Sequence, residues 1–155
     1  MSILGLHKPS WLLLIVLWLL TSSTAFADTR SLVLVTSETS PALELSGKEI
    51  RWLFMGLPVV KAGQRIEPLI NATTPLVYEV FLQKVIYMSA QNYERRLVVR
   101  AFRLGGRRPE KYDNQVTLLR NLRENPNAVT FMWQDDAQRQ AKIKIVTELW
   151  SGKIK

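Results

Sequence analysis

Residues 69–88 constrain the fold most, because they have the pattern of a strand that passes into a helix through a short polar turn. The apolar residues Ile66, Leu69 and Ile70 predict the end of the strand. Pro75 occupies the position of a first helical residue, and Thr74 before it is suited to be the N-cap. Residues at three- and four-residue spacing then follow: Val77, Val80, Phe81, Lys84, Val85 and Met88. This spacing predicts an amphipathic helix.

The amino end of this predicted helix is a candidate anion-binding site. A strand–turn–helix corner directs unpaired backbone N–H groups and the positive end of the helix dipole toward one point. In this interpretation Thr73 and Thr74 donate their hydroxyls, Leu76 and Val77 donate backbone N–H groups, and Asn71 lies in the same turn. The alternative is an ordinary, well-capped corner whose role is structural only.

The first 27 residues have the three parts of a secretory signal peptide. Lys8 precedes an unbroken apolar run over residues 11–20, and the cleavage motif Ala25-Phe26-Ala27 follows. We expect cleavage after Ala27, which would leave residues 28–155 as one periplasmic domain. The alternative is an uncleaved anchor, although the run is shorter than the roughly 20 apolar residues that span a bilayer. We expect no transmembrane segment after cleavage.

The composition argues against catalysis. The chain has no cysteine, and its only histidine, His7, lies in the predicted signal peptide. The mature chain would therefore lack a thiolate nucleophile, an imidazole base and the nitrogen and sulfur ligands of most metal sites. The only adjacent pair of acids, Asp135 and Asp136, is expected to open a short helix as N-cap and N1 charge. We expect a protein that is not an enzyme and has no cofactor and no metal site.

The charge favours anionic partners. Residues 28–155 contain 20 Lys and Arg against 13 Asp and Glu, a net charge of +7. This balance indicates a small anion, an anionic membrane surface or an acidic envelope protein, and export argues against nucleic acid. Seven of the basic residues lie in residues 94–111. Three interpretations of this cluster stay open: a solvated helix face, an anion-binding loop at Arg107 and Arg108, and a docking surface for an acidic partner.

Predicted strands and helices alternate along the chain, which indicates an α/β layer architecture. Strands are predicted at residues 31–36, 66–70, 128–133 and 142–146, the last at a sheet edge. Helices are predicted to begin at the N-caps Ser46 (with Glu49 as a capping box), Thr74, Ser89 and Asp113. The expected buried stripes are Ile50, Leu53, Phe54 and Leu57 in the first helix, Tyr93, Leu97, Ala101 and Leu104 in the third, and Val116, Leu119 and Leu122 in the fourth.

Four motifs resemble, in their order, the phosphate ABC-transporter substrate-binding family. They are Phe54-Met55-Gly56, the strand at residues 65–69, the helix end at residues 81–85, and the segment at residues 126–131. The resemblance implies a single lobe of the type 2 periplasmic-binding-protein fold, with a mixed sheet flanked by helices, in the periplasm. It also implies recognition of a phosphate-like anion.

The chain departs from that family at positions that bear on binding. The turn before the helix has neither the family's arginine nor its glycine, and Asn127 and Thr130 replace the two glycines of the later motif. Two hypotheses follow. In the first, Asn71, Thr73, Thr74, Leu76, Val77, Arg107 and Arg108 bind a small anion. In the second, the ligand site is lost, and the chain is an accessory subunit of a membrane sensor or envelope complex.

The signal-peptide prediction sets the N-terminus of the mature protein. Intact-mass measurement of the exported protein should show that residues 1–27 are absent and that the chain begins at Asp28. A full-length species that is extracted only with detergent would contradict cleavage and the periplasmic assignment.

Overall fold

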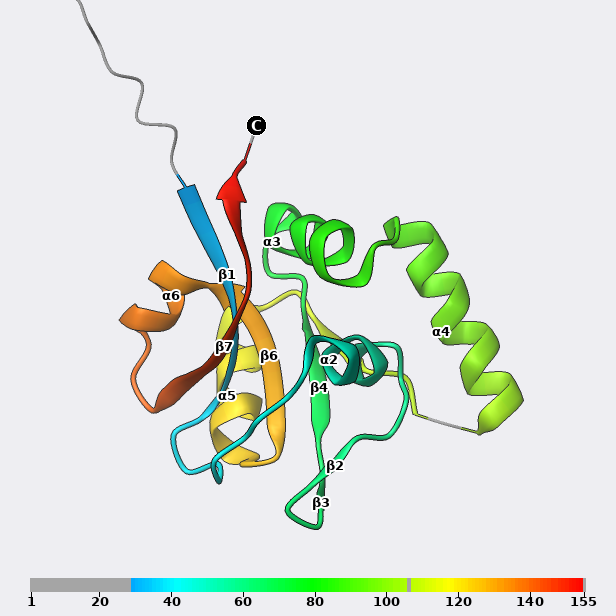
Figure 1. Cartoon of the computed structure of the whole chain (residues 1–155), viewed down its shortest axis with the longest axis horizontal. Coiled ribbons are helices and arrows are strands. Elements are labelled where there is room, and N and C mark those ends of the chain that lie inside the picture. The colour runs from blue at the N-terminus through cyan, green and yellow to red at the C-terminus, as the bar shows by residue number, and fades with distance from the viewer. Residues whose placement is uncertain (1–28, 106, 155) are drawn as a thin grey trace, which may run out of the picture.

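Five strands form one mixed sheet, and helices cover both of its faces (Figure 1). The structure is a computed structural model that describes residues 29–105 and 107–154, and of Leu104 the backbone only. The predicted signal peptide and the new N-terminus at Asp28 lie outside the described residues. No helix in the described part of the chain is long and apolar enough to cross a membrane.

The sheet has the strand order β5-β4-β6-β1-β7, and β2 and β3 form a separate two-stranded ribbon. Strand β4 runs parallel to β5 and β6, whereas β1 runs antiparallel to β6 and β7. The strands are β1 (Thr29–Ser37), β2 (Val60–Lys61), β3 (Gln64–Arg65), β4 (Glu67–Asn71), β5 (Glu110–Tyr112), β6 (Ala128–Trp133) and β7 (Ile143–Lys153). The predicted α/β fold with a mixed sheet is thus confirmed.

The helices pack on the sheet in two layers. They are α2 (Gly47–Phe54), α3 (Pro75–Phe81), the π-helix η1 (Leu82–Ile86), α4 (Ala90–Leu104), α5 (Gln115–Glu124) and α6 (Gln134–Arg139). Because successive strand residues point to opposite faces, Leu32 and Leu34 of β1 join the core beneath α2, α3 and α4. Val33 and Val35 join the second core, beneath α5 and α6. The result is a three-layer α/β/α domain.

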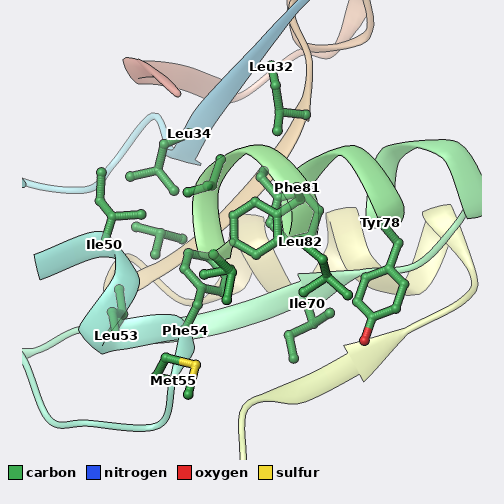
Figure 2. Close-up of a cluster of buried hydrophobic side chains, with 14 of the residues drawn as sticks. Leu32, Leu34, Ile50, Leu53, Phe54, Met55, Ile70, Tyr78, Phe81 and Leu82 are labelled. Atoms are coloured by element: carbon green, nitrogen blue, oxygen red, sulfur yellow. The ribbon is translucent and has the colours of Figure 1, made fainter. Parts of the chain in front are cut away.

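Three aromatic rings form the centre of the larger core. Phe54 of α2, Phe81 of α3 and Phe131 of β6 are all fully buried. The rings of Phe81 and Phe131 stack with centroids 3.6 Å apart, and Phe54 meets Phe81 edge-on at 4.8 Å. Figure 2 shows the side chains of Phe54 and Phe81 close together between α2 and α3. These contacts attach both helices to the same point of the sheet.

Most predicted helix starts are confirmed. Ser46 and Glu49 form the expected capping box of α2, Thr74 caps α3, and Ser89 caps α4. Helix α4 ends at Gly105, which has a φ of 61° and donates its N–H to the carbonyl of Ala101. Such a left-handed C-cap suits glycine because it has no Cβ. The next residue, Gly106, lies outside the described residues.

Two predicted caps are wrong. Asn114 rather than Asp113 caps α5, because its Oδ1 accepts the N–H of Thr117 at 3.0 Å, three residues into the helix. In α6, Asp135 and Asp136 are not the cap and first residue, because the helix already begins at Gln134. Both acids lie in its first turn, where negative charge interacts favourably with the helix dipole.

Three predicted core positions are also wrong. Lys84 is exposed because η1 inserts a wider turn, which shifts the buried face onto Leu82, Val85 and Ile86. Val116 is 75% exposed, and Leu118 takes its place in the core. Leu57 is half-buried and follows the end of α2 rather than extending its apolar face.

The aromatic contacts predict a large cost for truncating one ring. Phe81→Ala should lower the free energy of unfolding by about 3–5 kcal/mol, because it leaves a cavity between two packed rings. The matched control is Phe102→Ala, since Phe102 is 87% exposed on α4. It should change stability by less than about 0.5 kcal/mol. Urea denaturation measures both, and equal losses would contradict the packing described.

Candidate anion-binding site

A cavity of about 220 Å³ opens at the carboxyl ends of the parallel strands β4 and β6. Helices α3, α5 and α6 begin around it, so each directs its amino end to the same region. The side chains that line it are Asn71, Thr73, Thr74, Val77, Gln115, Leu118, Leu119, Met132, Trp133 and Asp136. Four residues of the predicted site therefore lie together in one cavity.

The topology explains the position of this cavity. Strand β4 leads into α3 on one face of the sheet, and β6 leads into α6 on the other face. The two chains therefore separate beyond the carboxyl ends of neighbouring parallel strands. Such a switch point leaves a crevice, which is where open α/β sheets bind their ligands.

Buried side chains extend the pairing of β4 and β6 toward the cavity. The paired residues are Glu67 with Ala128 and Pro68 with Val129. Further along, the Thr130 hydroxyl donates to the carbonyl of Leu69 at 2.8 Å. The Asn71 amide donates to the carbonyl of Phe131 at 2.8 Å. Thr130, which replaces a glycine of the resembled family, thus has a structural role between the strands.

The polar turn before α3 is internally hydrogen-bonded. Asn71 Oδ1 accepts both the N–H of Thr73, at 3.0 Å, and the Thr73 hydroxyl, at 2.8 Å. Thr74 Oγ1 accepts the N–H of Val77 at 3.4 Å. The Thr73 hydroxyl and the Val77 N–H, both predicted anion donors, are therefore already engaged. An anion would have to compete for them, which limits its affinity.

The amino ends of three helices point toward the cavity, but a carboxylate lies in its wall. The first turns of α3, α5 and α6 contribute partial positive charge. Asp136 lines the same cavity and forms an ion pair with Arg139 in the next turn of α6. Leu76, another predicted donor, is 40% exposed at the start of α3. No arginine or lysine is among the residues that line this cavity.

Arg107 and Arg108 lie elsewhere. They line a cavity of about 320 Å³ between the end of α2, the start of β4 and the segment before β5. Neither lines the cavity at Thr73 and Thr74. The structure does not bring the two halves of the predicted site together, because the arginines precede β5 whereas the threonines follow β4.

Arg108 instead takes part in an ionic cluster around Glu94. The Glu94 carboxylate accepts from Arg108 at 3.0 Å, from Lys111 at 3.2 Å and from the Tyr78 hydroxyl at 3.0 Å. Partial burial opposes ionisation of Glu94, but these hydrogen bonds and the charges of Lys111 and Arg108 hold its pKa below the ordinary value. Burial and the bond to Glu94 raise the pKa of Tyr78 above its ordinary range. The cluster joins α3, α4 and β5.

The cavity residues that the sequence interpretation omitted come from other elements. These are Gln115, Met132, Trp133 and Asp136, which reach the site because β6 and α5 lie next to β4 and α6 follows β6 directly. The sequence feature that could have indicated Met132 and Trp133 is the apolar strand that ends at Trp133. The carboxyl ends of neighbouring parallel strands lie at the same edge of a sheet, so the end of this strand was a candidate for the same site. Across the described residues, no group of three or more His, Cys, Asp or Glu side chains is placed to hold a metal.

Comparison with known proteins supports the fold. No protein-family model matches this chain, and no curated protein matches it in sequence. Among solved structures the chain is similar to an ABC-type phosphate transport receptor from Vibrio cholerae, with a TM-score of 0.52 and 10% identity. The match covers 78% of this chain and 47% of the receptor chain, so this chain spans about half the receptor's length. The chain therefore has the α/β fold of one periplasmic-binding-protein-like lobe.

The Glu94 cluster predicts a pH-dependent contribution to stability. A carboxyl group whose pKa is lowered by folding stabilises the native state above its unfolded pKa, and this contribution is lost as the pH falls through the folded pKa. Glu94→Gln should therefore destabilise the protein by about 1 kcal/mol at neutral pH, a value reduced for partial solvent screening. The difference from wild type should shrink below the ordinary pKa of 4.5.

Thermal unfolding at a series of pH values measures this effect. The control is Glu79→Gln, because Glu79 is exposed on α3 and forms no salt bridge in the part of the chain that the structure describes. A Glu94→Gln deficit that stays constant down to pH 3 would show that the charge of Glu94 is not what stabilises the cluster.

Proposed function

We propose that this chain is an exported, non-enzymatic binding-protein-like lobe that holds a small phosphate-like anion at the carboxyl ends of β4 and β6. The observation that carries the proposal is the cavity in which the turn residues Asn71, Thr73 and Thr74 meet the amino ends of three helices. Backbone N–H groups and hydroxyls at helix starts bind oxyanions through hydrogen bonds and the helix dipole.

The comparison adds support for the class of ligand. The receptor from Vibrio cholerae is described as a phosphate transport receptor, and this chain shares its fold over 78% of the chain. The predicted signal peptide would deliver the protein to the periplasm. Within the site, the backbone N–H groups of Leu76 and Val77 and the hydroxyls of Thr73 and Thr74 are the proposed anion contacts.

A second candidate function rests on a specific observation. The cavity contains the Asp136 carboxylate and lacks the charges of Arg107 and Arg108. A wall carboxylate repels an anion, and the internal bonds of the turn satisfy two of its proposed donors. These features favour an accessory subunit of a membrane sensor or envelope complex, in which the fold is kept and the ligand site is lost.

Isothermal titration with phosphate, sulfate and acetate separates these functions. The wild type should bind phosphate or sulfate saturably, and Thr73→Val should weaken binding about tenfold or more, since it removes a hydroxyl without a large change of volume. Arg107→Ala/Arg108→Ala is the matched comparison outside the cavity and should bind within a few-fold of wild type. Saturable binding that only the arginine variant loses would place the anion at the other cavity. No binding by any of the proteins would favour the accessory subunit.

A further inference from the structure

Helix α4 presents an outer face that combines arginine with apolar side chains. Four of its exposed residues recur at positions i, i+3, i+4 and i+7, which places them in one stripe along the helix. Phe102, at one end of the stripe, is 87% exposed. The stripe, called here the α4 outer face, consists of Arg95, Val98, Val99 and Phe102, and exposed Arg96 and Arg103 flank it.

The rest of α4 holds this face outward. Tyr93 is fully buried and donates its hydroxyl to the carbonyl of Phe54 at 2.6 Å, and Leu97 is buried beside it. Glu94, the helix's only acid, is engaged by Tyr78, Arg108 and Lys111. None of the three outward arginines forms an ion pair within residues 29–105 and 107–154. The outer face is therefore cationic and without an internal counter-charge.

We propose that the α4 outer face binds the surface of an anionic phospholipid bilayer. Guanidinium groups form paired hydrogen bonds with phosphate oxygens, as the headgroups of such a membrane provide. Exposed Phe102 and the two valines can enter the boundary between headgroups and acyl chains, as the apolar residues of interfacial helices do. A zwitterionic bilayer has no net negative surface charge, so it should attract the arginines much more weakly than an anionic bilayer does.

The shape of α4 favours a membrane over a protein partner. Figure 1 shows α4 at the outer edge of the domain, on the side away from α5 and α6. None of the stripe's four side chains lines a cavity described above. A 15-residue helix is about 22 Å long and about 10 Å wide. This footprint is well below the roughly 800 Å² per partner of a stable protein interface, whereas weak, reversible membrane contact needs no such area.

Co-sedimentation with lipid vesicles tests the proposal on the processed, exported protein. Vesicles of phosphatidylcholine mixed with phosphatidylglycerol should bind the wild type at low salt, and vesicles of phosphatidylcholine alone should not. Arg95→Gln/Arg103→Gln should reduce the partition coefficient about tenfold or more, and Phe102→Ser should reduce it several-fold. Because all variants share one N-terminus, any contribution of that segment cancels in the comparison. Circular dichroism should show unchanged folding, since these side chains are exposed.

The matched control lies on the opposite side of the sheet. Helix α5 carries an exposed valine and an exposed arginine one turn apart, Val116 and Arg120. Val116→Ser/Arg120→Gln should leave vesicle binding unchanged. Equal losses in the α4 and α5 variants, or α4 variants that bind like wild type, would overturn the proposal. It would also be overturned if the wild type did not bind anionic vesicles at low salt.

Discussion

The fold and its cavity depend on how β4 is joined to β6. Backbone pairing between these parallel strands involves Pro68, which has no N–H to donate. Toward the carboxyl ends, hydrogen bonds from Thr130 and Asn71 to the carbonyls of Leu69 and Phe131 hold the two strands together. Both side chains are at most 4% exposed, so loss of either would leave a buried carbonyl without its partner. The polar residues in this core are therefore required by the sheet itself.

The same arrangement creates the site. Past Asn71 the chain turns into α3 on one face, and past Trp133 it turns into α6 on the other, so the space between the two turns is left open. The Asn71 side chain connects the sheet to this turn. Its NH2 group donates to the carbonyl of Phe131 in β6, and its Oδ1 accepts from the N–H and the hydroxyl of Thr73 in the turn. The structural and binding interpretations of the corner are thus not exclusive. An anion would use a turn that is already fixed by the sheet, which lowers the entropy cost of binding.

Local sequence patterns correctly predicted the features that depend on residues close together in the sequence, namely helix caps and a buried strand. The caps Ser46, Thr74 and Ser89 and the strand β6 follow from short-range hydrogen bonding and from continuous apolar runs. The errors arise where a neighbour one position away competes, as Asn114 does with Asp113, or where a π-turn shifts the helical period, as at Lys84. The placement of Arg107 and Arg108 away from Thr73 depends on the parallel direction of β4 and β5, which local patterns do not specify. Tertiary topology also brings Gln115 and Asp136 into the site.

We have proposed that an anion binds between the carboxyl ends of β4 and β6. Backbone-amide NMR spectra recorded during a phosphate titration test it most directly, because each N–H reports on its own surroundings. We expect saturable shifts at Thr73, Leu76, Val77 and Gln115, with small or no shifts at Gly56, Arg107 and Arg108. Saturable shifts confined to Gly56 and the two arginines, or no saturable shift anywhere, would contradict it.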